Sequence, residues 1–275
     1  MPTPEETKTY FRGLFDRTAP TYDAVAADFF TPFGRRLVDL AGIQPGWNVL
    51  DVGTGRGAVL RPAADAVGPT GSVHGVDLSP VMVEKTSREL IDAGIPHARV
   101  EVGDAENPPE LAGGWDAVTA GLVVFFLPDG ATALSNWRAR IRSNGVLAMS
   151  TFAHDDKRWD PVFDAFRPHL PEHVTPSQLP PGGWHRQDES VMTMLTDAGF
   201  ASIRSTTEVF TTTFRDAEHW IDFSYSNGMR AYWEAVSDET RGVMRADVAA
   251  AIDELADSQG SLTMDTGVRF TTARA

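Results

Sequence analysis

The chain has 275 residues, of which 42% are apolar, and its formal net charge is −14. This apolar content is enough to build a full core, and the acidity repels phosphate backbones and anionic membranes, so neither a nucleic-acid nor a membrane partner is expected. The absence of cysteine excludes disulfides, thiolate metal sites and cysteine nucleophiles. Residues 1–9 do not form a secretory signal and the apolar run 117–127 is too short to span a bilayer, so a cytoplasmic location is expected.

In chain order, the apolar spacing first predicts an amphipathic helix over 24–41, which the turn Gln44-Pro45-Gly46 ends. Strands are then predicted, separated by helical stretches, at 48–53, 72–77, 98–103, 115–122 and 145–152. Alternation of this kind predicts an α/β fold with a parallel sheet and helices on both faces. Ser79 and Asp129 are predicted to cap the helices that follow them.

The first of these strands ends at a glycine-rich turn. Glycines at 53, 55 and 57 allow the backbone to approach a ligand closely and tolerate a positive φ. Asp77 ends the second strand, where a carboxylate can accept both ribose hydroxyls of an adenosine. Asp104 ends the third strand, in position to accept a hydrogen bond from an adenine amino group. Together these residues predict a site for a nucleotide-like cofactor.

The glycine-rich turn by itself does not decide which nucleotide-like cofactor binds. Gly53-x-Gly55-x-x-Ala58 matches the dinucleotide fingerprint, so an NAD(P)-dependent oxidoreductase is one alternative. Asp51, a charge inside an otherwise apolar strand, and Asp104 favour a different cofactor, as does the lack of a Tyr-x-x-x-Lys dyad.

The motif order resembles class I S-adenosylmethionine (SAM)-dependent methyltransferases, most nearly the type-11 or ubiquinone/menaquinone-type branch. The resemblance rests on Asp-x-Gly-x-Gly-x-Gly from Asp51, Val76-Asp77-Leu78-Ser79 and Gly103-Asp104-Ala105, and it covers roughly residues 10–152. It implies a Rossmann-like sheet of seven strands, mostly parallel, with an antiparallel last strand and helical lid insertions. It also implies that the cofactor is SAM and that the product formed from it is S-adenosylhomocysteine. The residues expected to bind SAM are Tyr22, Asp51, Gly53, Thr54, Gly55, Gly57, Asp77, Leu78, Met82, Gly103, Asp104, Ala105, Gly121 and Leu122.

Beyond residue 152 the regular alternation stops, and the lid insertions that the resemblance implies are assigned to the irregular and helical stretches found there. The expected parts are cover helices with the SAM-binding core over 1–152, a first lid insertion over 153–187, a core helix and strand over 188–213, a second helical lid insertion over 214–262 and a final core strand over 263–275.

Methyl transfer from a sulfonium is an in-line displacement that mainly requires positioning and exclusion of water. A base is needed only if the acceptor must lose a proton, and histidine suits that role. His154, two residues after the fifth strand, is the first candidate, although a histidine on a surface loop is the more common explanation for a residue in this position. Tyr22 lies in the segment that resembles the family's cofactor cover, where it would contact the methionine moiety, face the acceptor or pack an entry helix.

Aromatic residues concentrate in the two insertions, which favours a hydrophobic or aromatic acceptor, although the insertions would also need such residues for a core of their own. The expected acceptor contacts are Trp184, His185, Trp220, Tyr225 and Trp233. No metal site is expected, because Pro171 separates His169 from His173 and breaks their helical spacing.

These observations predict a SAM-dependent methyltransferase that moves a methyl group to O, N or C of a small, largely hydrophobic metabolite in specialised biosynthesis. The expected partner is that small-molecule acceptor, and the enzyme is expected to be a monomer or homodimer. Besides the oxidoreductase, a SAM-binding fold recruited as a non-methylating cyclase or binding protein stays open, because function lives in the site rather than in the fold.

Overall fold

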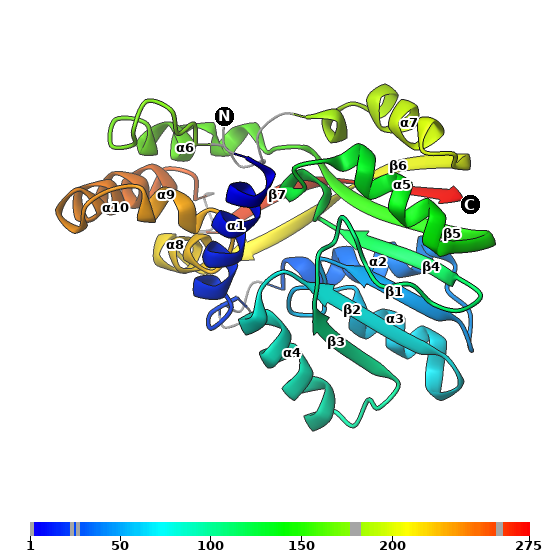
Figure 1. The fold of residues 1–275 in the computed structure, drawn as a ribbon. Coiled ribbons are helices and arrows are strands. Elements are labelled where there is room, and N and C mark those ends of the chain that lie inside the picture. Colours follow the sequence, from blue (N-terminus) through cyan, green and yellow to red (C-terminus); the bar gives the residue numbers. More distant parts are fainter. Residues whose placement is uncertain (1–2, 23–24, 26–27, 177–182, 257–260) are drawn as a thin grey trace.

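The computed structural model describes residues 3–22, 25, 28–176, 183–256 and 261–275. Within these residues the chain forms a seven-stranded sheet with the order β3-β2-β1-β4-β5-β7-β6 (Figure 1). The strands are β1 (Asn48–Val52), β2 (Ser72–Asp77), β3 (Ala98–Val102), β4 (Trp115–Gly121), β5 (Ile141–His154), β6 (Ala201–Phe214) and β7 (Leu262–Arg274).

Strands β1 to β5 pair in parallel, whereas β7 runs antiparallel between β5 and β6. This arrangement confirms the predicted sheet and its antiparallel last strand. The last strand begins at Leu262, one residue before the expected range of 263–275, and Leu262 pairs with Phe214 at the end of β6. Both long strands therefore extend past the carboxyl ends of the parallel strands.

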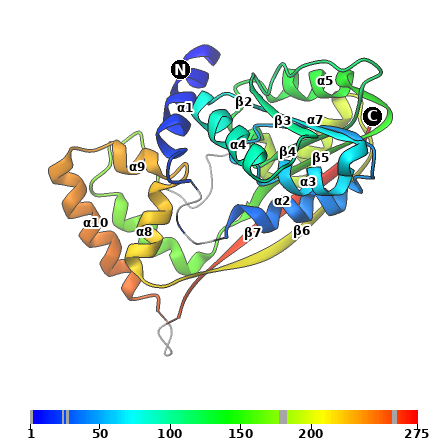
Figure 2. The same ribbon diagram turned by 90° about the horizontal axis from the view of Figure 1, so that it is seen from below.

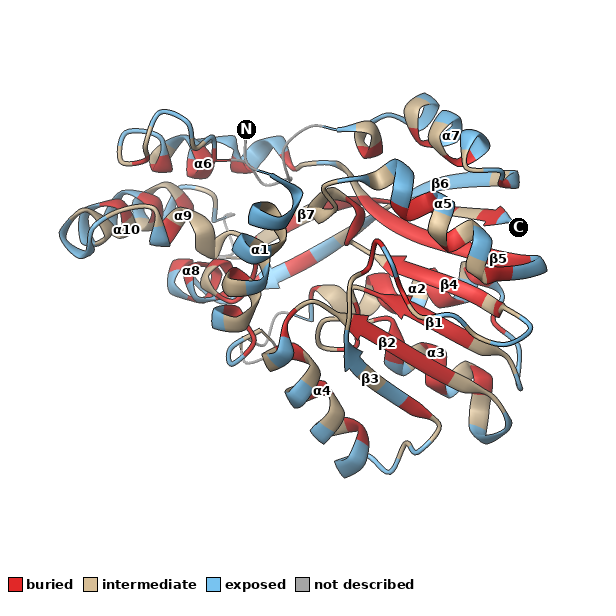
Figure 3. Cartoon of the chain, viewed as in Figure 1, coloured by how far each residue is buried: buried red, intermediate tan, exposed pale blue. Residues whose placement is uncertain are grey.

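Helices cover both faces of the sheet. One face carries α2 (Phe30–Ala41), α3 (Leu60–Val67) and α4 (Pro80–Asp92), and the other carries α5 (Gly130–Arg140) and α7 (Asp188–Asp197) (Figure 1). The central strands are accordingly buried on both sides (Figure 3). The helix expected over 24–41 begins at Phe30, and positions 24, 26 and 27 of that prediction lie outside the described residues.

A second group of helices lies beyond the carboxyl ends of the parallel strands (Figures 1 and 2). It consists of α6 (Asp160–Phe166), α8 (Ala217–Tyr225), α9 (Arg230–Glu234) and α10 (Asp238–Asp253), and we call it the helical unit. Helix α10 contacts both α6 and α8, and Trp159 stacks on Trp220 with ring centroids 5.3 Å apart. The two segments 153–187 and 214–262, distant in sequence, thus supply helices that share one core.

Helix α1 (Pro4–Thr18) lies between the sheet and the helical unit, where it contacts α4 and α9. Thr3 starts it with a capping box to Glu6. Ser79 and Asp129 cap α4 and α5 as expected, accepting hydrogen bonds from the backbone of Met82 and Thr132 at 3.1 and 3.0 Å. Among the described residues no helix combines the length and apolarity needed to cross a membrane.

Candidate active site

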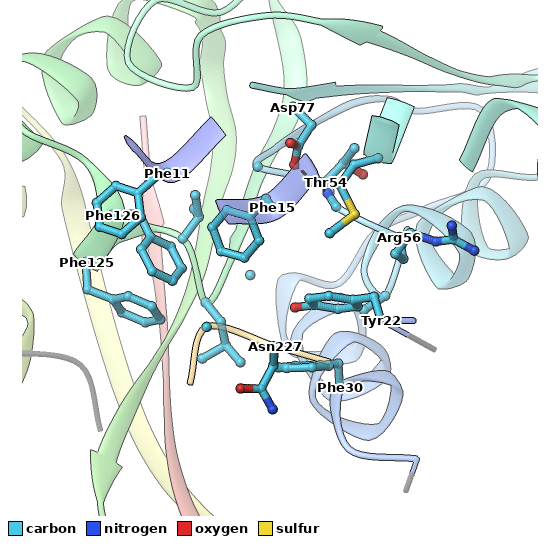
Figure 4. Close-up of a pocket in the computed structure, with 18 of the residues that line it drawn as sticks. Phe11, Phe15, Tyr22, Phe30, Thr54, Arg56, Asp77, Phe125, Phe126 and Asn227 are labelled. Carbon is cyan, nitrogen blue, oxygen red and sulfur yellow. Dashed lines mark hydrogen bonds between the residues drawn. The ribbon is translucent and has the colours of Figure 1, made fainter. Parts of the chain in front are cut away.

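A cavity of about 1570 Å³ opens at the carboxyl edge of the sheet, lined by residues of the strand ends, α1, the helical unit and the segment around Trp184 (Figure 4). Pockets for one drug-sized ligand are about 300–1,000 Å³. The cavity therefore has room for a cofactor and an acceptor together.

The glycine-rich turn after β1 forms one end of this cavity. Gly53 and Gly55 have φ angles of 65° and 51°, a region that strains other residues. A Cβ on Gly53 would lie 2.3 Å from a methyl carbon of Val123, whereas the corresponding position on Gly55 has no described atom within 4 Å. The turn thus presents bare backbone to open space, which fits the close approach of a nucleoside cofactor.

Asp77 connects this turn to the start of α4. Its carboxylate accepts hydrogen bonds from the backbone N–H of Gly55 at 2.8 Å and of Ser79 at 2.9 Å. Burial raises the pKa of Asp77, and these N–H donors oppose the rise. Figure 4 shows Asp77 beside Thr54 at the cofactor end of the cavity. The carboxylate both shapes the turn and lines the space where a ribose would lie.

Asp51 lines the floor of the cavity and is only 1% exposed. It accepts hydrogen bonds from the hydroxyls of Thr54 at 2.6 Å and Thr119 at 2.7 Å. Burial raises the pKa of Asp51 to about 6, although the two hydroxyls favour the ionised form. Such a carboxylate can attract a cationic group of a bound ligand.

Asp104 is tied to the helix that covers the cavity. Lys8 of α1 donates to the Asp104 carboxylate at 2.7 Å and lies 2.5 Å from the Glu106 carboxylate. Burial lowers the pKa of Lys8, but the two carboxylates outweigh that effect and raise it overall. Nothing in the sequence motif indicated Lys8, because it lies far from Asp104 along the chain.

The other predicted cofactor contacts gather around the same space. Of the fourteen positions named from the resemblance, Gly103 does not line the cavity, and the thirteen that do are Tyr22, Asp51, Gly53, Thr54, Gly55, Gly57, Asp77, Leu78, Met82, Asp104, Ala105, Gly121 and Leu122. The donors, acceptors and bare backbone present here fit SAM.

The opposite wall of the cavity is aromatic. Phe11 and Phe15 of α1 pack edge-on against Phe126 of the short helix η2 (Val124–Phe126), with ring centroids 4.9 and 5.1 Å apart. Tyr22 stacks on Phe30 at 5.1 Å (Figure 4). Large aromatic faces of this kind suit a flat, apolar acceptor.

A single turn, η4 (Trp184–Arg186), brings two predicted acceptor contacts to the cavity. Both Trp184 and His185 line it, and His185 is 4% exposed, with its ring centroid 5.6 Å from that of Phe125. His185 is therefore a buried, titratable group beside the aromatic wall.

The remaining acceptor predictions do not reach the cavity. Trp220 stacks on Trp159, and Tyr225 stacks on Trp233 at 4.7 Å, so these side chains build the core of the helical unit. None of Trp220, Tyr225 and Trp233 lines the cavity. The sequence could not separate a lid core from a binding wall, because both require large aromatic side chains.

His154, the predicted base, is also placed away from the cavity. Strand β5 continues to His154, which pairs with Gly267 of β7, so this residue lies on the sheet rather than on a loop at the cavity. Its side chain is exposed and does not line the cavity, whereas Tyr22 does.

Glu234 links the two covers of the cavity. Its carboxylate accepts hydrogen bonds from Arg17 of α1 at 2.7 Å and from Arg230 of α9 at 2.7 Å. Arg17, Glu234 and the nearby Tyr232 all line the cavity. Helix α1 is thus attached to the helical unit across the mouth of the site.

The methyltransferase domain family matches residues 49–145. The chain is 33% identical to nocamycin O-methyltransferase of Saccharothrix syringae over 95% of this chain and 97% of that protein. It is 36% identical to aklanonic acid methyltransferase of Streptomyces sp. (strain C5) over 70% of this chain and 92% of the relative. Its fold is similar to the crystal structure of the 4+2 cyclase SpnF, with a TM-score of 0.62 and 17% identity over 99% of this chain and 96% of that one.

The chain therefore belongs to the class I SAM-dependent methyltransferases. Within this class its relatives place it in the type-11 branch, and it is an enzyme that uses SAM to methylate a small molecule. The alternative of an NAD(P)-dependent oxidoreductase, which Gly53-x-Gly55-x-x-Ala58 permitted, was wrong. That pattern is shared because both classes need a glycine turn beneath a nucleoside.

Proposed function

We propose that this enzyme methylates an oxygen atom of a small, largely aromatic metabolite in specialised biosynthesis. The observation that carries the proposal is the continuous cavity in which the glycine turn faces an aromatic wall and the buried His185. Oxygen is favoured over nitrogen or carbon because a relative that the chain covers almost completely is named as an O-methyltransferase. We also propose that segments 153–187 and 214–262 act as the lid. The cytoplasmic location and the monomeric or homodimeric state stay predictions.

The roles of the residues follow from their places in the cavity. When bound, SAM supplies an electrophilic methyl group. The glycine turn, Asp77 and Asp104 hold the nucleoside, and the ionised Asp51 attracts the cationic part of the cofactor. The aromatic wall holds the acceptor and excludes water, which orients the reacting oxygen.

We assign the proton-accepting role to His185. For a hydroxyl acceptor, the oxygen–carbon bond forms as the sulfur–methyl bond breaks, S-adenosylhomocysteine leaves, and the hydroxyl proton passes to the imidazole. His185 suits this role because it is buried at the acceptor wall, whereas His154 lies outside the cavity. A carboxylic acid acceptor is already ionised at neutral pH and would not need the base.

The test is a product analysis with methyl-deuterated SAM and matched aromatic acceptors that carry a phenolic hydroxyl, a carboxyl, an amine or an unsubstituted ring carbon. Labelled methyl on oxygen, located by mass spectrometry and NMR, is the expected result, and label on nitrogen or carbon would contradict the proposal. With a hydroxyl acceptor, His185→Gln should lower kcat by about 100-fold. Full activity of that variant on the hydroxyl acceptor would remove His185 from the reaction.

A second candidate function is a cyclase that binds SAM without transferring its methyl group. This candidate is suggested by the similarity to the cyclase SpnF, which extends over 99% of this chain. A similarity at 17% identity concerns the fold alone. SAM binding without labelled product from any acceptor in the panel would favour this candidate over methyl transfer.

A further inference from the structure

We propose that Arg269, which does not touch the cavity, is a positioning residue that fixes His185 for catalysis. This inference rests on the role proposed for His185. Arg269 lies on β7, 84 positions further along the chain than His185, and the proposed base would depend on it.

Arg269 is a buried charge on β7, only 7% exposed. Its guanidinium donates to the backbone carbonyl of His185 at 2.9 Å and to that of Arg186 at 3.2 Å, and it forms an ion pair with Asp188 at the start of α7. One side chain thus contacts η4 and the helix that follows it. The planar fork of arginine suits two adjacent carbonyls, which a lysine ammonium cannot contact in the same way.

Burial of such a charge is costly unless every partner is in place. The groups that offset the desolvation of the Arg269 guanidinium are the carbonyls of η4 and the carboxylate of Asp188 at the start of α7. This desolvation is therefore compensated when η4 is packed on β7. Because η4 is a single turn without a core of its own, contacts from outside it must fix its position. The guanidinium supplies two of them, one to the carbonyl of His185, which carries the proposed base, and one to the carbonyl of the next residue, Arg186.

The groups around His185 determine how a change in its position would affect catalysis. Among the described residues, the rings beside it include Phe125 and Trp184, which are uncharged, and the charged groups that contact its segment include Arg269 and Asp188. His173 also lines the cavity but is exposed. A shift of η4 would therefore move the imidazole relative to both the acceptor and this ion pair, which changes the rate and its dependence on pH.

The experiment compares Arg269→Gln, Arg269→Lys, His185→Gln and the double variant His185→Gln/Arg269→Gln. We expect Arg269→Gln to lower kcat by about 10- to 100-fold on a hydroxyl acceptor, because a misplacement of about 1 Å costs a rate factor of that order. The dissociation constant of SAM should not change. The acidic limb of the kcat–pH profile should shift in Arg269→Gln and disappear in His185→Gln, and Arg269→Lys should recover only part of kcat.

Arg241→Gln is the matched control. Arg241 also donates to two backbone carbonyls, those of Trp233 at 2.8 Å and Val236 at 3.2 Å, and pairs with Asp238, but it does so within the helical unit. This variant loses contacts of the same kinds at a more exposed position and should keep the wild-type pH profile. The double variant His185→Gln/Arg269→Gln should be no slower than His185→Gln alone, because Arg269 acts through His185.

The outcomes separate the two proposals. If His185→Gln keeps full activity on the hydroxyl acceptor, the proposed base is wrong and the positioning role falls with it. If His185→Gln is slow while Arg269→Gln keeps the wild-type kcat and pH profile, the base stands and the role of Arg269 is overturned. Additive losses in the double variant, or the same pH shift in Arg241→Gln, would also overturn it and leave Arg269 a purely structural residue.

Discussion

The two ends of the cavity are built in different ways. The cofactor end comes from strand ends and the turns that follow them, and much of it lies within one stretch of chain from Asp51 to Asp104. The acceptor end is assembled from α1, η2, η4, α9 and β7, which are spread over the whole chain. The cofactor end relies on backbone conformation and hydrogen bonds, whereas the acceptor end relies on the packing of aromatic side chains.

This difference indicates which residues tolerate substitution. A cofactor that never varies is matched by a turn whose φ angles and hydrogen bonds leave little room for substitution, as at Gly53 and Asp77. An acceptor wall of packed rings tolerates replacement as long as volume and apolarity are kept. The same scaffold can therefore serve different acceptors through changes at the second end alone.

The largest effect is expected where an aromatic residue belongs to the helical unit rather than to the wall. Trp220→Ala should destabilise the fold by about 3 to 5 kcal/mol, because the ring is fully buried against Trp159 and Phe163. Denaturant unfolding measures this change. Trp184→Ala is the control, since Trp184 lines the cavity, and it should raise the KM of the acceptor with a smaller loss of stability. A wild-type unfolding curve with a raised KM for Trp220→Ala would make that residue an acceptor contact after all.

The next effect is expected at the cofactor end. Asp77→Ala should weaken SAM binding by about 100-fold, because the variant loses charge-assisted hydrogen bonds to the backbone of Gly55 and Ser79 that shape the turn. Calorimetric titration with SAM measures it. Asp65→Ala, a carboxylate on α3 that also lines the cavity, is the matched control and should bind SAM within a few-fold of the wild type. Equal binding by wild type and Asp77→Ala would show that the turn holds its shape without the carboxylate.

A smaller effect follows from the pKa of Asp51. Since burial raises that pKa to about 6, the carboxyl is ionised above this pH and protonated below it. The affinity for the cationic cofactor should therefore fall by about 10-fold as the pH falls from about 8 to about 5, and Asp51→Asn should lose this dependence. The free energy of unfolding changes in the opposite direction: because the pKa of Asp51 is raised from 3.8 to about 6, its contribution to stability falls as the pH rises between these values, and the variant should be more stable than the wild type above about pH 6. An unchanged pH dependence of SAM binding in Asp51→Asn would assign the titration to another group.

The sheet could be predicted because its signals are local. Strands β1, β2 and β4 are short, largely apolar runs that end at or next to a glycine or an acidic residue, and Ser79 and Asp129 mark helix starts by their own side chains. The antiparallel direction of the last strand came from the resemblance rather than from any periodicity, because its pairing with β5 and β6 is not encoded in a local pattern.

The site was predictable only in part, for related reasons. Asp77 and the glycines follow from spacing, but Lys8 reaches Asp104 through the placement of α1 across the sheet edge. Trp184 and Trp220 are the same residue type in similar surroundings of sequence, and only packing sends one to the cavity and the other to a core. His154 was misplaced because β5 runs on to this residue, a length set by its pairing with β7.

The carboxylate of Glu234 joins Arg17 of α1 to Arg230 of α9, so α1 and the helical unit are attached to each other through one side chain. Ion pairs this accessible to solvent stabilise by about 1 kcal/mol or less and weaken as salt is added. Because one carboxylate contacts both α1 and α9, salt should weaken both attachments together. We therefore expect higher ionic strength to speed the release of methylated product and the exchange of spent cofactor in parallel.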